Sequence, residues 1–355
     1  MQIMPEFGLA GAETMCENLT YELIKRGHEV FVISLFDFHS PITERLEHHN
    51  VPLIYLHKKL GLDLPIIRRI RKVLKKERPD IIHTHRYLLK YVAAAAIGLP
   101  IKGFIHTVHN IAQKENLKKD RMINGFLFKL KRFQPVALSP LVQKTINEVY
   151  KLPKNKIPVV YNGVTMDSLN TARGYTLGER INIIHVGRYT DVKNHLALMQ
   201  AIVDLHHNEP RVVLHLFGDG ELKSEIDNFI TTHKADDYII DNGLSDNIQQ
   251  KLLEADIFVL PSKYEGIPMT IIEAMRSGLP IVASHVGGIP DMIDNGKDGL
   301  LCGTDKESIE ACLEKVISDN RLREQIGKSA LKKAEMFSAA KMAEEYERIY
   351  HSFLR

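Results

Sequence analysis

The chain is poor in cysteine, lacks tryptophan and has no long hydrophobic run. Its three cysteines, Cys16, Cys302 and Cys312, lie far apart and form no CxxC pair, so neither a disulfide framework nor a cysteine zinc site is expected. No segment approaches the roughly 18 consecutive apolar residues that a membrane-spanning helix needs. The opening residues MQIMP lack the basic and apolar regions of a secretory signal. We therefore expect a reduced, cytoplasmic protein.

The composition is that of an ordinary globular protein, with 44% apolar and 26% charged residues over 355 positions. At roughly 150 residues per domain, this length suggests about two domains. The net charge of +3 conceals an asymmetry. Residues 1–165 carry 26 Lys and Arg against 14 Asp and Glu, whereas the remainder carries 21 against 30. A basic half indicates either an anionic partner or a solvated basic surface.

Strand-like apolar runs alternate with helical stretches along the chain, which predicts parallel sheets with helices on both faces. The runs are rich in Val and Ile without strict alternation, as expected for strands that are buried on both faces. The expected strands are residues 29–35, 81–84, 103–107, 135–139, 158–161, 182–186, 211–217, 238–240, 257–260 and 280–283. The clearest helices are residues 14–26, 65–77, 268–277 and 339–355. A turn at residues 162–164, before the second alternating series begins at Asn182, marks the domain boundary.

A glycine-containing loop, residues 8–13 (GLAGAE), precedes the first helix. Such loops let backbone amides approach an anion, but two glycines three residues apart also fit a plain tight turn. A second loop, residues 187–195 (GRYTDVKNH), follows an expected strand and carries Arg188 and Lys193. Because ligands of open α/β sheets bind at the carboxyl ends of strands, these two cations can converge on one phosphate group. The alternative is a pair of solvated surface cations.

The most informative segment is residues 261–274 (PSKYEGIPMTIIEA), which follows an apolar strand. It places Glu265 in a loop and Glu273 in a helix, eight residues apart, so that both carboxylates are expected towards one end and one face of the site. A carboxylate accepts hydrogen bonds from vicinal hydroxyls, and Gly266 with the amides around Met269 and Thr270 suits a diphosphate. The alternative is a capping residue and an exposed surface carboxylate. The apolar neighbours of Glu273 predict instead that it is partly buried.

Three further features are weaker. Residues 218–220 (GDG) form another glycine turn at a strand end. Histidines 83, 85, 106 and 109 lie at strand ends, where hydrogen-bonding roles are favoured over metal ligation because no cysteine or carboxylate cluster accompanies them. Two basic segments, residues 68–76 and 114–133, indicate either core-facing helices with solvated lysines or, for the second segment, an interfacial helix on an anionic membrane. Nucleic acid is not expected as a partner, since no recognition motif or aromatic platform is present.

Taken together, the sequence resembles the retaining glycosyltransferases of family four, which have the GT-B architecture. The resemblance covers nearly the whole chain. It is carried, in order, by residues 11–13, 26–30, 79–85, 106–109 and 162–164, by Gly187, Arg188 and Lys193, by the E-x7-E pair Glu265 and Glu273, and by residues 287–288 and 298–299. Family members usually begin with a full first strand carrying Lys or Arg, whereas only residues 2–4 precede Pro5 here, so a shortened first strand is expected.

The resemblance implies an α/β fold of two Rossmann-like, doubly wound parallel-sheet domains facing each other across a cleft. An acceptor-binding domain would span residues 1–163 and be completed by the C-terminal helix 339–355, and a nucleotide-sugar-binding domain would span residues 164–338. The donor would be a nucleotide-diphosphate sugar, most commonly a UDP-sugar. Arg188 and Lys193 would neutralise its diphosphate, with amides near Met269 and Thr270 assisting.

The remaining roles also follow from the resemblance. Glu273 would hold the ribose hydroxyls, Glu265 would contact sugar hydroxyls, and the base would lie near Ile240, within residues 240–243. The Gly11 backbone would touch the phosphate or sugar, and His109 would lie beside the donor sugar. Catalysis would therefore fall to Glu265, His109, Arg188 and Lys193.

The implied reaction is sugar transfer with retained anomeric configuration by front-face attack, in which the leaving phosphate takes the acceptor proton. Neither a metal nor a cofactor is expected, since Arg and Lys supply the positive charge. The acceptor would be a glycan or a polyprenyl-diphosphate-linked sugar in bacterial surface polysaccharide synthesis, with association of the basic half at the inner face of the membrane. A sugar-nucleotide epimerase of the same fold and a non-catalytic nucleotide-sugar-binding module stay open as alternatives.

Overall fold

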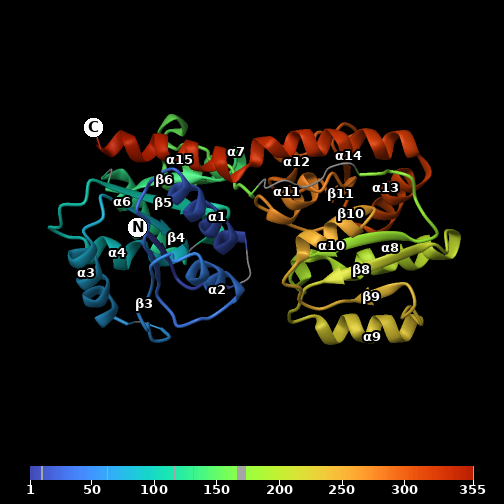
Figure 1. The fold of residues 1–355 in the computed structure, drawn as a ribbon, viewed down its shortest axis with the longest axis horizontal. Coiled ribbons are helices and arrows are strands. Elements are labelled where there is room, and N and C mark those ends of the chain that lie inside the picture. Colours follow the sequence, from blue (N-terminus) through green and yellow to red (C-terminus); the bar gives the residue numbers. More distant parts are fainter. Residues whose placement is uncertain (9–10, 62, 116, 131, 166–172, 355) are drawn as a thin grey trace. The chain divides into compact units, whose positions relative to one another are not determined.

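The computed structural model describes residues 1–8, 11–61, 63–115, 117–130, 132–165 and 173–354. The chain divides into two compact units (Figure 1). The N-terminal unit comprises residues 1–165 and 338–355, and the C-terminal unit comprises residues 166–337. Each unit contains one six-stranded sheet, and every recorded strand pairing is parallel. The expectation of two α/β halves with doubly wound parallel sheets is confirmed.

The elements of the N-terminal unit follow an alternating order. Its strands are β1 (Gln2–Met4), β2 (Val32–Ser34), β3 (Leu53–Tyr55), β4 (Ile81–His85), β5 (Gly103–Val108) and β6 (Gln134–Ala137). Its helices are α1 (Gly11–Lys25), α2 (Pro41–His48), α3 (Pro65–Glu77), α4 (Leu89–Ala95), α5 (Ala112–Glu115), α6 (Lys118–Lys129), α7 (Pro140–Tyr150) and α15 (Ala339–Leu354), with 3-10 turns η1 (Arg86–Leu88) and η2 (Lys154–Lys156).

The C-terminal unit repeats the alternation. Its strands are β7 (Ile181–Val186), β8 (Val212–Phe217), β9 (Ile239–Asp241), β10 (Ile257–Leu260), β11 (Ile281–Ser284) and β12 (Leu300–Cys302). Its helices are α8 (His195–Asn208), α9 (Lys223–His233), α10 (Ile248–Glu254), α11 (Met269–Arg276), α12 (Ile289–Met292), α13 (Lys306–Ser318) and α14 (Asn320–Ala334), with 3-10 turns η3 (Asp191–Lys193) and η4 (Glu335–Phe337).

Both sheets are wound in the same way. Their strand orders are β3-β2-β1-β4-β5-β6 and β12-β11-β10-β7-β8-β9. In each sheet the chain starts at a central strand, moves outward to one edge, and then returns to build the other edge. The direction in which successive strands are added to the sheet therefore reverses between β1 and β4 in the first sheet and between β7 and β10 in the second. Ligands of open α/β sheets bind at the carboxyl ends of the strands beside such a switch point.

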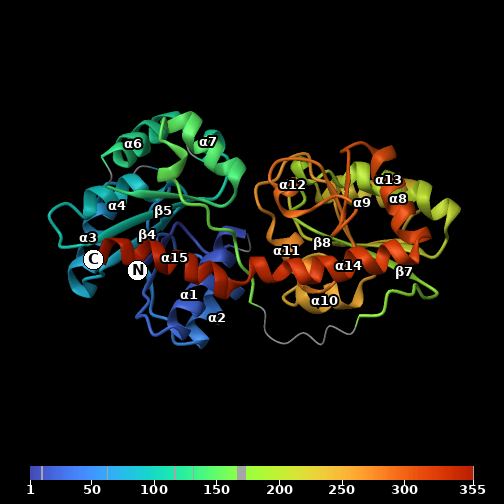
Figure 2. The same ribbon diagram turned by 90° about the horizontal axis from the view of Figure 1, so that it is seen from above.

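Helices cover both faces of the N-terminal sheet because successive strand residues point to opposite sides. On one side, Ile3 and Ile33 share a buried cluster with residues of α3, α4 and α7. On the other side, Met4 and Val32 pack with α1 and α2, and Ile105 and Val136 pack with α1 and α15. Helix α15 lies beside α1 in both views (Figures 1 and 2). The last helix of the chain therefore completes the core of the first unit.

Some sequence expectations need correction. Residues 158–161 form only an isolated bridge, in which Val159 pairs with Ala137, rather than a strand. The strands β3 and β12 were not expected, because each is a three-residue edge strand, which is too short to show a periodic pattern. The first strand, β1, has three residues and pairs with both β2 and β4.

Candidate functional site

Glycines bring the loops of the C-terminal unit into direct backbone contact. A Cβ atom on Gly218 would lie 2.0 Å from the carbonyl oxygen of Gly187, and one on Gly220 would lie 2.5 Å from that of Tyr189. The loop after β7 is therefore packed against the loop after β8 more closely than any side chain would permit. This contact gives a physical reason for the glycine turn that the sequence places at residues 218–220.

A second close approach supports the loop after β10. Gly287 has a φ of +56°, and a Cβ atom there would lie 1.8 Å from the Glu265 carbonyl oxygen. A Cβ atom on Gly288 would lie 2.1 Å from the Gly266 carbonyl oxygen, and the Gly288 amide donates to the Glu265 carbonyl at 3.1 Å. The backbone at Glu265 and Gly266 is thus held in place by two adjacent glycines after β11.

Asn194 ties together the loops on either side of the switch point. It adopts a left-handed conformation with a φ of 61° at the start of α8, and it is buried. Its side-chain amide donates to the carbonyl oxygens of Pro261 at 3.0 Å and Thr304 at 2.8 Å. The Lys263 amide also donates to the Val192 carbonyl at 2.8 Å. Arg188 and Lys193 therefore lie on a loop that is fastened to the loop carrying Glu265.

Lys193 and Glu265 form an ion pair across these two loops. The distance from Lys193 Nζ to Glu265 Oε1 is 2.5 Å, and the exposed fractions of the two side chains are 19% and 12%. The Ser262 hydroxyl donates to the same Oε1 atom at 2.7 Å. Removing one partner of such a shielded pair leaves the other charge uncompensated. The two residues that the sequence assigned to phosphate and sugar binding are thus in direct contact.

Arg188 and Glu273 are the unpaired members of the predicted set. The Arg188 side chain is exposed and makes no hydrogen bond or ion pair with a residue that the structure describes. Glu273 is partly buried, as expected, and its carboxylate likewise has no hydrogen-bond partner in the described chain. Burial raises the pKa of Glu273 to about 7, although the charge of Arg276 opposes the rise. Helix α11 begins only at Met269, so helical spacing does not place Glu265 and Glu273 on one face.

The start of α11 has the free groups that a bound anion would use. No side chain caps this helix, whose N-cap residue is Pro268. The Thr270 hydroxyl is buried and has no partner among the described residues. Gly266 lies in the preceding loop and Met269 is buried. Helix N-termini favour anions through their amides and dipole. This arrangement is compatible with the predicted contribution of Met269 and Thr270 to diphosphate binding.

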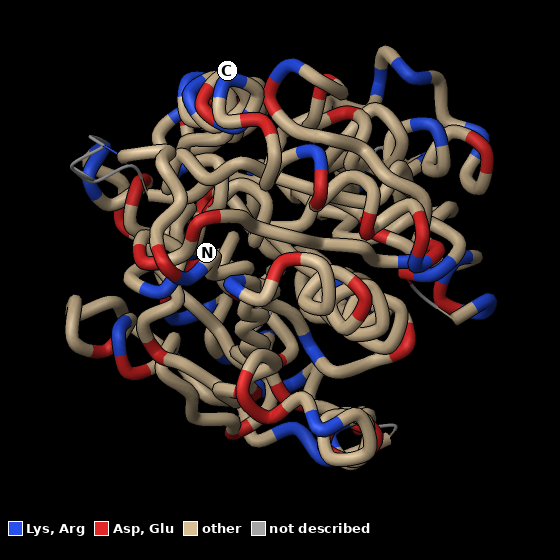
Figure 3. The backbone as a smooth tube through the Cα atoms, turned by 90° about the vertical axis from the view of Figure 1, so that its right-hand side faces the viewer, with Lys and Arg blue, Asp and Glu red and all other residues tan. Residues whose placement is uncertain are grey.

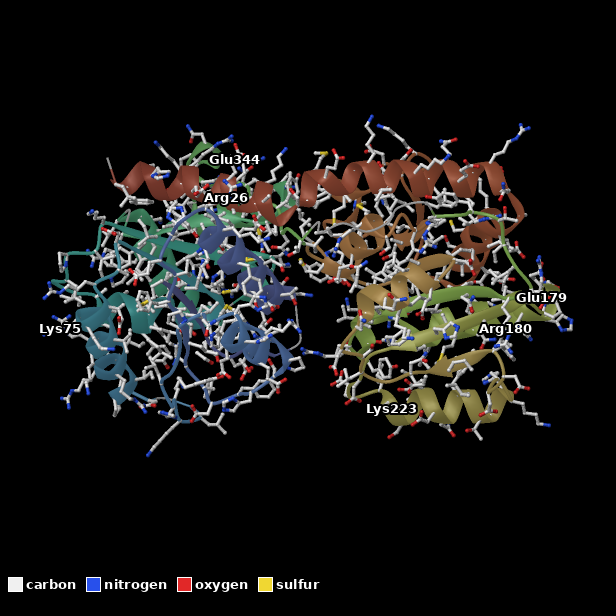
Figure 4. All side chains as sticks on the ribbon, in the orientation of Figure 1. Arg26, Lys75, Glu179, Arg180, Lys223 and Glu344 are labelled. Atoms are coloured by element: carbon white, nitrogen blue, oxygen red, sulfur yellow. The ribbon has the colours of Figure 1, made fainter. Side chains whose placement is uncertain are left out.

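The region predicted to hold the base, residues 240–243, contains a polar cluster whose partners Tyr189 and Lys223 sequence reasoning did not single out. Ile240 lies in β9, and the next residue, Asp241, accepts hydrogen bonds from the Tyr189 hydroxyl at 2.6 Å and from Lys223 at 2.5 Å. The Gly243 amide also donates to Asp241 at 2.9 Å. Lys223 stands at the start of α9 and is labelled in Figure 4. The position of Asp241 at the end of a strand was the signal that could have identified it.

The switch point of the N-terminal unit contains a chain of neutral polar side chains. His109 follows β5, and its Nε2 atom lies 2.9 Å from Nδ1 of His85, the last residue of β4. His85 Nε2 lies 2.9 Å from the side-chain oxygen of Gln2 in β1. Burial lowers the pKa of His109 to about 3 and places that of His85 well below its ordinary value. The sequence singled out His85 and His109 but not Gln2.

An ion pair lies beside these hydrogen-bonded side chains, at the predicted Gly11 loop. Gly11 is the first residue of α1, and residues 9–10 of the loop lie outside the described residues. Glu13 in the first turn of α1 pairs with Arg86 after β4, at 2.8 Å between Oε1 and Nη1. Burial raises the pKa of Glu13, and the charge of Arg86 opposes that rise. The second oxygen of Glu13 is buried and has no partner in the described chain.

The other histidines at the strand ends are engaged in hydrogen bonds. His83 meets the Tyr350 hydroxyl and the Thr107 hydroxyl, each at 2.7 Å. His106 Nδ1 meets the Thr84 hydroxyl at 2.9 Å. Within the described residues, no group of three or more His, Cys, Asp or Glu side chains could hold a metal ion. The geometry therefore agrees with the hydrogen-bonding roles that the sequence favoured.

The two basic helices differ in what they bury; the charged positions along the backbone are marked in Figure 3. Helix α3 buries Ile66, Ile70 and Leu74, so it is a core-facing helix with solvated cations such as Lys75, labelled in Figure 4.

Helix α6 has the opposite arrangement. It buries Asn124, Gly125 and Phe128 but leaves Met122 74% and Phe126 63% exposed. Leu117 and Leu130, which flank it, are also exposed, and Lys131 lies outside the described residues. No helix in the part of the chain that the structure describes is long and apolar enough to cross a bilayer.

Comparisons with known proteins match both halves of the chain. A family model described as "Glycosyltransferase Family 4" matches residues 9–168, and one described as "Glycosyl transferases group 1" matches residues 174–333. The chain is 30% identical over 351 residues to the UDP-Gal:alpha-D-GlcNAc-diphosphoundecaprenol alpha-1,3-galactosyltransferase of Escherichia coli, covering 91% of this chain and 88% of that protein. It is 27% identical over 376 residues to the N-acetyl-alpha-D-glucosaminyl L-malate synthase of Bacillus anthracis, covering 98% and 95%.

A solved structure shares the fold over the same extent. The structure of Alr3699/HepE from Anabaena in complex with UDP matches with a TM-score of 0.82 and 18% identity, covering 99% of each chain. At that identity the likeness concerns the fold alone.

Proposed function

This chain belongs to glycosyltransferase family 4, and on that premise we propose that it transfers a sugar from a UDP-linked donor to a glycan or polyprenyl-diphosphate-linked acceptor. The E. coli relative, whose name includes both a UDP-sugar and a diphosphoundecaprenol, supports this choice of donor and acceptor. The Anabaena structure of the same fold, which holds UDP, supports the choice of base. Bacterial surface polysaccharide synthesis is the setting that this pair of substrates suggests.

The observation that carries the proposal is the Lys193–Glu265 ion pair between the loops after β7 and β10. Within this pair, each group neutralises the other and holds it in place. We propose that a donor diphosphate takes over Lys193, which frees Glu265 to accept hydrogen bonds from hydroxyls of the sugar. The exposed Arg188 and the uncapped start of α11 supply further positive potential for the diphosphate.

Glu273 suits a role in holding the ribose. Its carboxylate is partly buried and has no partner in the described chain, and burial holds its pKa at about 7. Two vicinal hydroxyls can both donate to one carboxylate, which favours its ionised form. The ribose would thus supply the hydrogen bonds that the protein itself leaves unmade.

The proposed chemistry is transfer with retention by front-face attack, without a metal ion. The bond between the sugar C1 atom and the diphosphate oxygen breaks, a bond from C1 to the acceptor oxygen forms, and the acceptor hydroxyl proton moves to the departing diphosphate. Negative charge then grows on the diphosphate, where Arg188, Lys193 and the α11 amides would stabilise it. Such fixed charges often make the largest contribution to catalysis.

A ligand screen tests the proposal most directly. The change in melting temperature is measured with UDP, GDP and ADP and with their common sugar conjugates, because a ligand that binds only the folded state raises apparent stability. We expect stabilisation by UDP and one UDP-sugar, followed by UDP release when lipid-linked or glycan acceptors are added. Binding without turnover against any acceptor would instead favour a non-catalytic nucleotide-sugar-binding module.

Helix α6 supports a second part of the proposal, namely that the N-terminal unit docks on an anionic membrane. Its exposed Met122 and Phe126 are flanked by Lys118, Lys119 and Lys129, the combination of apolar and basic side chains that interfacial helices use. We expect the protein to bind vesicles of anionic lipid at low salt and not zwitterionic ones. Changing Met122 and Phe126 to Ser should release it, whereas changing the exposed Leu244 to Ser should not. Equal retention of both variants would contradict this docking surface.

A further inference from the structure

The N-terminal unit holds a directed chain of hydrogen bonds that ends at His109. Gln2, His85 and His109 come from β1, β4 and the end of β5, which are neighbours in the sheet. Two contacts of 2.9 Å join them, from Gln2 Oε1 to His85 Nε2 and from His85 Nδ1 to His109 Nε2. Gln2 and His85 are buried, whereas His109 is only partly buried. These hydrogen bonds therefore lead from the core towards the carboxyl end of the sheet.

The direction of each hydrogen bond follows from the groups involved. The Gln2 oxygen can only accept, so His85 must carry its proton on Nε2. Because burial keeps His85 neutral, its Nδ1 atom has no proton and must accept from His109. His109 therefore carries its proton on Nε2, and its own Nδ1 atom has a free lone pair. That atom has no partner among the residues that the structure describes.

We propose that Gln2 and His85 are positioning residues that hold His109 in the Nε2-protonated tautomer, so that His109 Nδ1 can accept a hydrogen bond from a hydroxyl of a sugar substrate. The contact with the sugar rests on the proposed function, whereas the tautomer does not. In this arrangement His109 is a fixed hydrogen-bond acceptor that orients the sugar and does not supply a proton to the reaction.

The tautomer is measured by NMR on the full chain labelled with ¹⁵N at histidine, without any ligand. In the wild type, the two ring nitrogens of His109 should show the shifts of a neutral ring protonated at Nε2. Gln2→Met removes the acceptor while keeping the side-chain length. We then expect the fraction of the Nδ1-protonated form of His109 to rise about fivefold, the effect of losing one hydrogen bond. Unchanged His109 shifts in Gln2→Met would overturn the proposal.

Kinetics then test the hydrogen-bonded relay from Gln2 through His85 to His109 separately from the proposed function. For release of UDP from the donor identified by the ligand screen, Gln2→Met should lower kcat/KM in proportion to the fraction of His109 that leaves the Nε2-protonated form, and His109→Ala should lower it at least as much. If His109→Ala is fully active but Gln2→Met still shifts the tautomer, the sugar contact fails while the relay stands. If His109→Ala is impaired but Gln2→Met changes neither tautomer nor rate, the relay fails while the function of His109 stands.

Discussion

The two units have the same sheet winding but contain opposite kinds of chemistry at their switch points. In the C-terminal unit, the switch point carries the ion pair Lys193–Glu265, the exposed cation of Arg188 and loops packed through glycine backbones. In the N-terminal unit, it carries the neutral hydrogen-bonded chain from Gln2 to His109. Winding determines where a ligand can bind, and the side chains that follow the strands determine what it can be.

This contrast assigns separate tasks to the two halves. The cations proposed to bind the diphosphate belong to the C-terminal unit, although that half of the sequence is net acidic, with 21 Lys and Arg against 30 Asp and Glu beyond residue 165. Helices α3 and α6 carry many of the basic residues of the N-terminal half. Net charge by itself therefore does not predict where a phosphate would bind.

Removing the cation from the C-terminal switch point should have the largest effect. Lys193→Ala deletes the predicted diphosphate contact and leaves Glu265 without its partner. We expect kcat for sugar transfer to fall about 100-fold to 1,000-fold, the range found when one preorganised charge or donor is lost. Lys306→Ala is the control, because Lys306 also forms an ion pair in this unit, with Asp204 at 2.6 Å. Near-wild-type turnover in Lys193→Ala would contradict the phosphate role.

Separating the backbones beneath the same site should cost stability as well as activity. In Gly287→Ala, the new methyl group would lie 1.8 Å from the Glu265 carbonyl oxygen, on a backbone with a φ of +56°. We expect a loss of about 3 kcal/mol in the free energy of unfolding, since overpacking and left-handed strain add. Gly174→Ala is the control, because nothing lies within 4 Å of its Cβ position. Equal denaturation midpoints for the two variants would refute this account of the loop.

The pH dependence of donor binding sharpens the comparison further. Burial raises the pKa of Glu273 to about 7, and donor hydroxyls need its ionised form. Affinity for UDP should therefore be full above pH 7 and should weaken as the pH falls through 7, by about tenfold per pH unit well below it. Calorimetry at several pH values measures this dependence.

Glu273→Gln should bind UDP weakly and lose the dependence on pH. Glu310→Gln is the control. Glu310 in α13 is another partly buried carboxyl, and burial raises its pKa. UDP binding by this variant should keep its dependence on pH. A wild-type affinity that is flat between pH 6 and 8 would count against the ribose contact.

Much of the fold could be predicted from the sequence because local signals were strong. Helix α3 has the predicted bounds, since prolines stand at its first residue and just beyond its end. The edge strands β3 and β12 were missed because three residues cannot display a period. The loops carrying Arg188, Lys193 and Glu265 could be placed at strand ends from the sequence. Their roles in binding and catalysis stay predictions.

What could not be predicted depends on contacts between residues far apart in the chain. Lys193 and Glu265 are separated by 72 positions, and no spacing rule joins them. Gln2 is an ordinary polar residue until the sheet places it beside His85, 83 positions later. The polar cluster at Asp241 forms because Tyr189 and Lys223 converge on it. Such pairings come from tertiary packing, which a local pattern does not encode.

The central claim is that the C-terminal switch point holds the diphosphate of a nucleotide donor. A crystal structure of the protein with UDP tests it most directly. The account predicts phosphate oxygens within about 3 Å of Lys193 Nζ, with both ribose hydroxyls donating to Glu273 at a similar distance. UDP bound elsewhere, with the Lys193–Glu265 pair still closed and Glu273 still unpaired, would contradict it.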